Sequence, residues 1–185
     1  MKAKRALRDL WLFAYGSLMA EGIGSGAASE PARLFGYHRA LCIYSHVYRG
    51  TKKRPGLVLG LEPGGSCRGV AFRIQAGRVE AVIAKVTARE NVTGVYSLRQ
   101  VWVLIGKGRT RARRVPAVAF VAARNHPQYA GKLGRRAIAR CLREGKGTKG
   151  TASVYLKDVL TCLADLGIRD RALERIGKLV NEAKR

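Results

Sequence analysis

The chain has 185 residues, of which 47% are hydrophobic, and a formal net charge of +24 at pH 7. This length and hydrophobic content suit one globular domain over 1–185 and exclude a chain that is disordered throughout. Residues 1–10 form a basic lead-in without the apolar stretch of a signal peptide, and no apolar run approaches the roughly 20 residues of a transmembrane helix. We therefore expect a cytoplasmic protein that contacts no membrane.

Apolar patterns along the chain predict both strands and helices. Runs rich in Val, Ile, Leu, Phe and Tyr predict strands at 11–15, 33–44, 56–62, 68–74, 95–105 and 115–123. Hydrophobic residues at helical spacing predict helices at 76–88, 134–143, 152–166 and from 170, with a frayed tail at about 181–185. Gly167 is expected to end the third helix, and 145–150 to be a flexible connector. The fold class is therefore α/β, of the mixed α+β kind, with helices packed on a mixed sheet.

The cysteines and histidines show no metal-ligand spacing. Cys42, Cys67, Cys141 and Cys162 lie far apart, without a Cys-x-x-Cys pair, and the three histidines lack a third-ligand pattern. Neither a zinc site nor a disulfide framework is expected, and the thiols are predicted to be reduced and mostly buried. We expect no metal and no cofactor.

The excess of basic residues predicts contact with anions. Lys and Arg cluster at 52–54, 107–114, 135–136 and 146–149. A field of this strength attracts polyanions and anionic substrates, with a strong dependence on salt. No nucleic-acid recognition motif accompanies the charge, so a solvated basic surface is the alternative. We expect non-specific polyanion contact at most.

The end of the first predicted strand is a candidate ligand-binding loop. The buried run 11–15 stops at Gly16-Ser17-Leu18, where the chain can turn sharply and aim backbone N–H groups outward. Such groups hold a carboxylate or a developing oxyanion. An ordinary turn is the alternative for this loop taken alone.

Further strings follow this loop in a characteristic order. They are Gly36-Tyr-His-Arg-Ala-Leu-Cys-Ile-Tyr-Ser45, Tyr48-Arg-Gly-Thr51, Arg54-Pro-Gly-Leu-Val-Leu-Gly-Leu61, Gly64-Gly-Ser-Cys-Arg-Gly-Val-Ala-Phe72, Ala88-Arg-Glu-Asn-Val-Thr-Gly-Val-Tyr96, His126-Pro-Gln-Tyr-Ala-Gly131, Tyr155-Leu156 and Leu166-Gly-Ile-Arg-Asp170. Together with the loop, they resemble the ChaC-type γ-glutamylcyclotransferases. The resemblance extends from about residue 11 to about residue 173.

The resemblance implies a fold, a reaction and a substrate class. The fold is a small sheet curled into a barrel with packed helices. In the reaction, the α-amine of a γ-glutamyl group attacks its own γ-carbonyl and expels an amine, which from glutathione leaves 5-oxoproline and cysteinylglycine. Because both reacting atoms belong to one molecule, such an enzyme needs no protein nucleophile, metal or cofactor. We expect a monomer whose partner is this small-molecule substrate.

This chemistry requires a group that moves a proton from the substrate ammonium to the leaving amine. The chain has only twelve acidic residues. Glu90 stands out because it lies just beyond a predicted helix and before the next strand. The resemblance also marks the Arg89-Glu90 pair as catalytic. A surface salt bridge between these two neighbours is the alternative.

The resemblance also implies substrate-binding residues. Backbone amides at the end of the first strand would wrap the glutamyl group, and the hydroxyl of Tyr129 would contact it. Arg49 would pair with a substrate carboxylate or brace its loop, and Gly50 belongs to the same string. Tyr155 is assigned to packing because it falls on a helical stripe. The residues of the strand-end loop are Leu12, Phe13, Ala14, Tyr15, Gly16, Ser17 and Leu18.

The chain departs from the family pattern at three places that bear on substrate preference. Ala14 replaces the usual glycine, 19–26 replaces a Trp-x-Pro continuation, and 85–88 is unusual. Glutathione is the expected substrate. The alternatives are another γ-glutamyl peptide or amine, or a catalytically idle basic binding module.

Overall fold

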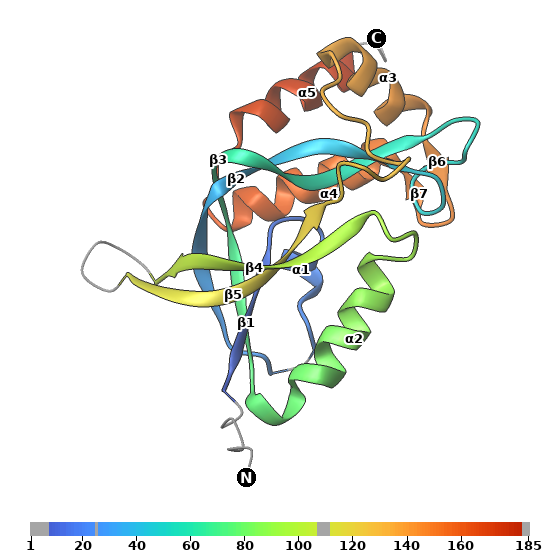
Figure 1. The fold of residues 1–185 in the computed structure, drawn as a ribbon. Helices are drawn as coiled ribbons and strands as arrows, with labels where there is room; N and C mark the ends of the chain where they lie inside the picture. The colour runs from blue at the N-terminus through green and yellow to red at the C-terminus, as the bar shows by residue number, and fades with distance from the viewer. Residues whose placement is uncertain (1–7, 25, 107–111, 183–185) are drawn as a thin grey trace.

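A closed barrel forms the centre of the molecule in the computed structural model, which describes residues 8–24, 26–106 and 112–182 (Figure 1). Its strands follow the order β1-β3-β2-β4-β5. β1 pairs antiparallel with β3 and parallel with β5, which closes the barrel. The strands are β1 (Leu10–Ala14), β2 (Ser29–Ser45), β3 (Gly56–Ile74), β4 (Tyr96–Ile105) and β5 (Arg113–Ala122).

Helices pack on two sides of this barrel. α3 (Arg135–Glu144), α4 (Ala152–Asp165) and α5 (Arg171–Glu182) contact one another, and α3 and α4 also contact β3. The one-turn α1 (Leu18–Glu21) follows β1, and α2 (Val79–Glu90) runs beside the barrel after the short 3-10 helix at Ala76–Arg78. A hairpin of β6 (Lys146–Gly147) and β7 (Gly150–Thr151) joins α3 to α4. No helix in the described part of the chain is long and apolar enough to cross a membrane.

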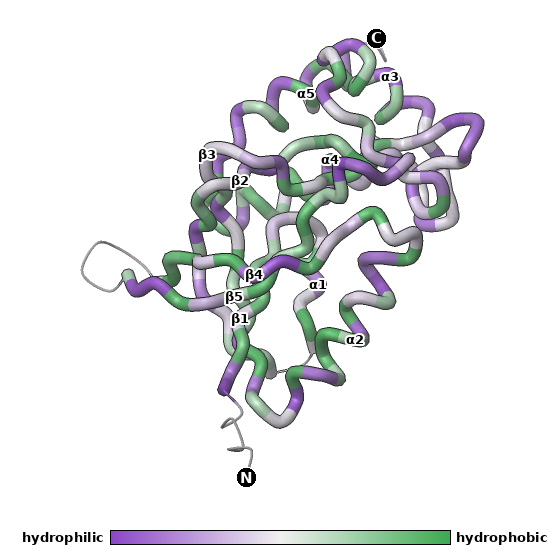
Figure 2. The backbone as a smooth tube through the Cα atoms, viewed as in Figure 1, coloured by the Kyte–Doolittle hydropathy of each residue, from purple (hydrophilic) through white to green (hydrophobic). Residues whose placement is uncertain are grey.

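The alternating pattern of the strands explains the barrel. In β4, Val101, Val103 and Ile105 are buried, whereas Trp102 between the first two is exposed. Side chains of a strand alternate between its two faces, so one face fills the barrel and the other meets solvent. Hydrophobic residues accordingly concentrate in the barrel strands and α4 (Figure 2).

The mixed α/β fold and its barrel are confirmed, but several predicted boundaries are wrong. The two strands predicted at 56–62 and 68–74 form the single β3, because Pro63, Ser66 and Cys67 remain paired with β2 and only Gly64 and Gly65 bulge out of the pairing. Helix α2 extends to Glu90 rather than ending at residue 88. The predicted connector 145–150 forms most of the β6–β7 hairpin, which ends at Thr151, and residues 181–182 of the predicted frayed tail belong to α5. Gly167 does follow the end of α4, with a φ of +65°.

The four cysteines are free, and two of them are fully buried. Burial raises the pKa of Cys42 to about 12 and that of Cys67 to about 11. Both thiols therefore stay protonated near neutral pH, where a thiol is a weak nucleophile.

Candidate active site

Two adjoining cavities lie where the end of β1, the end of α2 and the β6–β7 hairpin meet. The inner cavity is lined by residues 13–18 together with Leu59 and Phe120. The outer cavity is lined by residues 43–49 together with Gln128 and Lys149. Both are lined by Ser17, Glu90, Tyr96 and Tyr155. These four residues therefore form the boundary between the two cavities.

The loop after β1 lines the inner cavity and carries backbone donors that are not used within the described chain. In the described part of the chain, no hydrogen bond has the N–H of Gly16, Ser17 or Leu18 as its donor. The buried Arg39 fixes the loop, because its Nε donates to the carbonyl oxygen of Tyr15 over 2.6 Å. These N–H groups are available to a carboxylate or carbonyl oxygen of a ligand.

The support for this loop reaches into the helical layer. The guanidinium of Arg39 also contacts Asp170 Oδ2 at 3.0 Å and the carbonyl oxygen of Arg68 at 2.7 Å. Asp170 in turn accepts a hydrogen bond from the N–H of Leu173 in the first turn of α5. A buried arginine needs such complete pairing, and here the pairing ties the loop to the start of α5.

Glu90 lies at the last position of α2 and borders both cavities. Its Oε1 accepts hydrogen bonds from Arg89 Nε at 2.9 Å and Nη2 at 2.7 Å, and Arg89 also pairs with Glu21 at 3.0 Å. The Glu90 side chain is 27% exposed. Its Oε2 has no hydrogen-bond partner among the described residues. The salt bridge considered as the alternative role of Glu90 therefore exists, but it leaves one carboxylate oxygen for a ligand.

The buried Tyr155 and the partly buried Tyr96 complete the boundary between the cavities. Tyr96 donates its hydroxyl proton to the carbonyl oxygen of Leu59 over 2.7 Å, and the hydroxyl of Tyr155 accepts the N–H of Leu59 over 3.2 Å. Burial raises the pKa of both hydroxyls, and the Glu90 carboxylate adds to the effect. Tyr155 donates to no acceptor among the described residues. Its protonated hydroxyl is therefore an available donor, a role beyond the packing predicted from its helical stripe.

Cations surround the outer cavity. Arg49 Nη1 donates to the carbonyl oxygens of Lys149 at 2.6 Å and Thr151 at 3.4 Å, so Arg49 braces the β6–β7 hairpin. Lys149 carries its ammonium 4.1 Å from the ring centroid of Tyr48. Of the two roles considered for Arg49, bracing is the one that its contacts support.

Tyr129 lies outside both cavities. Its hydroxyl donates to Glu62 Oε2 over 2.8 Å, in a contact away from Glu90. The segment around it pairs with the end of β2 through Ala130 N–H to the carbonyl oxygen of Cys42 and Tyr44 N–H to that of Gln128. Gln128 lies in a turn that the Tyr129 N–H closes by donating to the carbonyl oxygen of His126, and it lines the outer cavity instead. The structure thus gives no support to the predicted contact between Tyr129 and substrate.

Two other predicted contact residues also lie outside the cavities. Leu12 is fully buried in the barrel core. Gly50 is buried against the backbone of Gly56, Ser45 and Arg54. Tyr96, Gln128 and Lys149 are cavity residues that sequence reasoning missed, although Tyr96 and Gln128 belong to strings that carried the resemblance.

Comparison with known proteins identifies the family. The family described as ChaC-like protein matches residues 10–183. The chain belongs to the ChaC-like family. A relative from Escherichia coli (strain K12), named glutathione-specific gamma-glutamylcyclotransferase, is 33% identical over 89% of this chain and 69% of its own length. A relative of the same name from Schizosaccharomyces pombe is 29% identical over 90% of this chain and 88% of its own length.

A solved structure confirms the ChaC-like fold. The crystal structure of a yeast γ-glutamyl cyclotransferase specific to glutathione superposes with a TM-score of 0.86. It covers 95% of this chain and 96% of that chain, at 19% sequence identity. The barrel and its packed helices are therefore shared over nearly the whole length.

Proposed function

We propose that the protein is a γ-glutamylcyclotransferase that cleaves glutathione to 5-oxoproline and cysteinylglycine. The observation that carries this proposal is the free Oε2 of Glu90 at the boundary of the two cavities, beside the free N–H groups of 16–18. The names of the curated relatives support the same substrate. The glutamyl group would occupy the inner cavity and the cysteinylglycine part the outer cavity.

Glu90 then acts as the proton shuttle of an intramolecular reaction. Its carboxylate takes a proton from the substrate ammonium, so the free amine attacks the γ-carbonyl carbon and a new C–N bond closes the ring. In this proposal the N–H groups of 16–18 bind the glutamyl carboxylate and the Tyr155 hydroxyl donates to the carbonyl oxygen; the nearness of that hydroxyl to Gly16 supports the arrangement. As the old amide C–N bond breaks, Glu90 returns this proton to the leaving nitrogen and also carries over the second proton that the attacking nitrogen loses, so the ring keeps one N–H and the amine leaves as an ammonium group. No protein nucleophile takes part, because ring closure joins two atoms that are already held together.

The first test is product formation. Purified protein incubated with reduced glutathione is expected to release 5-oxoproline and cysteinylglycine in equal amounts, with an undiminished rate in the presence of a chelator. Chromatography of both products provides the measurement. Absence of 5-oxoproline from glutathione and from every simple γ-glutamyl dipeptide would contradict the enzyme assignment and favour a catalytically idle binding module.

Lys149 is proposed to favour substrates that end in a carboxylate. Its ammonium lies on the outer cavity, where the glycine end of glutathione would extend. The contact is exposed, and exposed ion pairs contribute roughly 0.2–1 kcal/mol. Lys149→Ala is therefore expected to raise the KM for glutathione by about two- to fivefold, with kcat little changed.

A matched control for this prediction is Lys146→Ala on the same hairpin, since Lys146 is exposed and does not line the outer cavity. A γ-glutamyl amine without a carboxylate should show equal KM values for the wild type and Lys149→Ala. An unchanged KM for glutathione in Lys149→Ala would contradict this role.

The alternative substrate class is tested by comparing substrates of the wild type. A preference for the γ-glutamyl amine over glutathione would favour that class, which the changes at Ala14 and 19–26 motivate.

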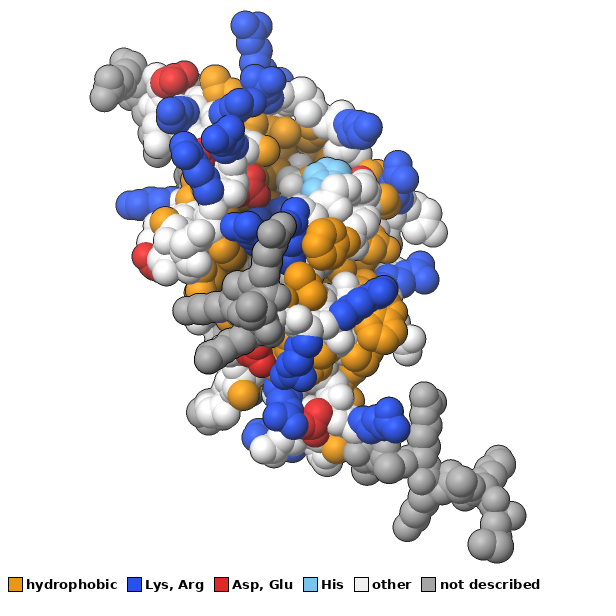
Figure 3. All heavy atoms as spheres, turned by 90° about the vertical axis from the view of Figure 1, so that its left-hand side faces the viewer, with side chains coloured by type: hydrophobic (Ala, Val, Ile, Leu, Met, Phe, Trp, Pro, Cys, Tyr) orange, Lys and Arg blue, Asp and Glu red, His pale blue; other side chains and the backbone are white. Residues whose placement is uncertain are grey.

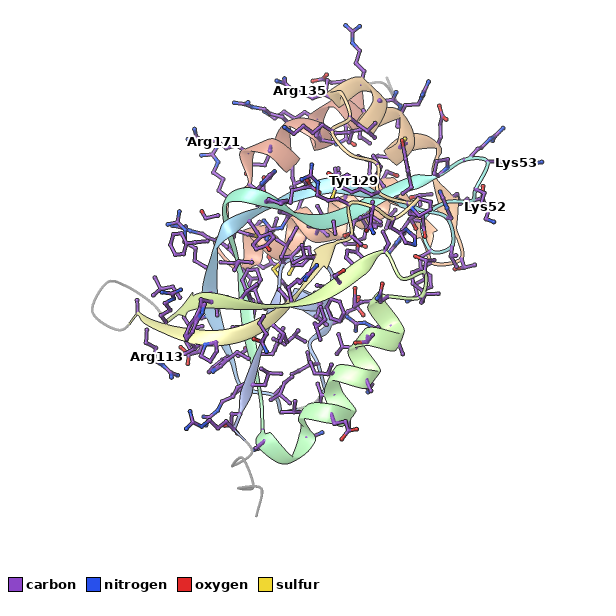
Figure 4. The ribbon with its side chains drawn as sticks, in the orientation of Figure 1. Lys52, Lys53, Arg113, Tyr129, Arg135 and Arg171 are labelled. Carbon is purple, nitrogen blue, oxygen red and sulfur yellow. The ribbon has the colours of Figure 1, made fainter. Side chains whose placement is uncertain are left out.

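The remaining expectations concern location, assembly and charge. We propose a cytoplasmic location, since four free cysteines suit a reducing compartment. We propose a monomer, since the described residues of one chain line both cavities. The charge of +24 is proposed to allow loose, salt-sensitive contact with polyanions. Its cations are spread widely: Lys52, Lys53, Arg113, Arg135 and Arg171 point outward from separate parts of the molecule (Figure 4).

A further inference from the structure

The outer face of the barrel carries a row of arginines that line neither cavity. Arg33 of β2 is paired with Arg68 of β3 on one side and with Leu104 of β4 on the other, and Leu104 is paired with Arg114 of β5. The three arginines are exposed. Directly paired residues of adjacent strands point to the same face of a sheet, so these side chains form one row across four strands. We call Arg33, Arg68 and Arg114 the arginine row.

A second row lies two residues further along the same face. Phe35 is aligned with Ser66, and Trp102 with Pro116. The register of β2 and β4 continues from Leu34 and Val103 to bring Phe35 beside Trp102, and both rings line one shallow hollow. They are 55% and 52% exposed, which is unusual for large rings. We call Phe35 and Trp102 the aromatic row.

The two rows are coupled by contacts between cations and rings. The guanidinium of Arg33 lies 4.8 Å from the Phe35 ring centroid, and that of Arg114 lies 4.7 Å from the Trp102 ring centroid. Arg33 is held in place by hydrogen bonds of 3.1 and 2.9 Å from its Nε and Nη2 to Ser66 Oγ. Since residues in a strand rise about 3.4 Å each, the rows stand roughly 7 Å apart.

The charge on this face has no acidic counterpart within the rows. The described residues aligned in the two rows are arginine, leucine, serine, phenylalanine, tryptophan and proline. On the side toward which the β4–β5 hairpin extends, exposed hydrophobic side chains lie among Lys and Arg side chains (Figure 3). Exposed rings beside unneutralised guanidinium groups fit a ligand that is flat and apolar on one side and anionic on the other.

We propose that this face binds single-stranded nucleic acid, with bases stacked on the aromatic row and phosphates paired with the arginine row. Bases of a single strand are free to stack on exposed rings, and a backbone of regular negative charge follows a line of cations. A duplex hides its bases, so it would use only the arginines. Stacking is tolerant of sequence, which agrees with a face that has few hydrogen-bonding groups to read base edges.

Fluorescence provides a direct test of this site. The chain has two tryptophans, and Trp11 is buried whereas Trp102 is exposed. Titration with an oligo-dT or oligo-U 20-mer is expected to quench the Trp102 emission, and the anisotropy of a fluorescein-labelled strand gives the Kd. Because stacking contributes roughly 1–3 kcal/mol per base, Trp102→Ala is expected to weaken binding by about tenfold. Trp102→Phe, which keeps a ring, should recover most of that loss.

Matched variants separate this site from general attraction by charge. Arg114→Ala should weaken binding of the single strand several-fold more than Arg171→Ala, which removes the same charge from an exposed position on α5. Turnover of glutathione by Trp102→Ala should equal that of the wild type, because Trp102 lines neither cavity. Equal turnover also shows that the variant is folded.

Several results would overturn the proposal. One such result is a duplex that binds as tightly as a single strand, and another is equal binding by Trp102→Ala and the wild type. Either would show that binding is due only to general electrostatic attraction. A blue shift of Trp102 emission with anionic vesicles and no response to oligonucleotides would assign the face to a membrane surface. A lower sedimentation coefficient for Trp102→Ala than for the wild type would assign it to self-association.

Discussion

Glu90→Gln is expected to lower the turnover of glutathione by about 10²–10⁴-fold, the usual contribution of general acid–base catalysis. The amide keeps the shape of the carboxylate but cannot accept the ammonium proton, so the amine stays protonated and cannot attack. The free Oε2 at the boundary of the two cavities is the atom that this change disables. Steady-state release of 5-oxoproline is the measurement.

Glu21→Gln is the matched control for this change. Glu21 pairs with the same Arg89 at 3.0 Å and also lines the outer cavity, but its side chain is 54% exposed. Loss of the exposed ion pair should alter turnover by less than about fivefold. If Glu90 acted only as a salt-bridge partner of Arg89, the two variants would behave alike.

Binding separates catalysis from positioning. The N–H groups of 16–18 and the Tyr155 hydroxyl remain in Glu90→Gln, so calorimetry should give a Kd for glutathione close to that of the wild type. The near-isosteric replacement leaves no cavity, and the unfolding midpoint should change little. Near-normal turnover in Glu90→Gln would show that Glu90 is not the proton shuttle.

The position of Glu90 at the cavities could be predicted from the sequence. An amphipathic helix, a glutamate and a strand follow one another closely in the chain, so their pattern is visible in the sequence. In the structure this glutamate, Glu90, lines the inner cavity together with the strand-end loop. The neighbouring Arg89 contact was also foreseeable, because it joins adjacent residues. Local pattern and an ordered set of family strings were sufficient for these features.

Features that depend on how distant segments align could not be predicted from local sequence patterns. Whether Tyr129 or Gln128 faces the cavity is decided by how the turn at 126–129 docks on the end of β2, which is distant from it in the chain. The arginine and aromatic rows bring together four strands whose residues are up to about 80 positions apart in the chain. The hydrophobic periodicity of one strand does not determine which strand it pairs with or in which register.

The role of Gly50 likewise depends on segments that are distant in sequence. A Cβ atom at this position would collide with the backbone of Gly56, Ser45 and Arg54. Gly145, at the end of α3, also approaches Gly56 and Arg49 too closely for a side chain. Three backbone segments therefore cross where only glycine fits, directly beside the Arg49 that braces the β6–β7 hairpin.

Gly50→Ala is accordingly expected to destabilise the protein by roughly 1–3 kcal/mol or more, the cost of forcing extra volume into a packed site. Because the atoms in the way belong to backbone rather than to flexible side chains, they have little freedom to move aside. Chemical denaturation with urea, followed by circular dichroism, gives the free energy of unfolding. The displaced backbone should also shift Arg49 and raise the KM for glutathione.

Gly77→Ala is the control for replacing a glycine with alanine at a position where no clash results. Its added Cβ would meet no atom within 4 Å, and its φ is not positive. This variant should match the wild type or gain a few tenths of a kcal/mol, since alanine restricts the unfolded chain more than glycine does. A Gly50→Ala variant with normal stability and a raised KM would instead place Gly50 in contact with substrate, as the family resemblance implies. If the close approach of the backbone segments explains Gly50, then Gly50→Ala should lose stability while Gly77→Ala should not.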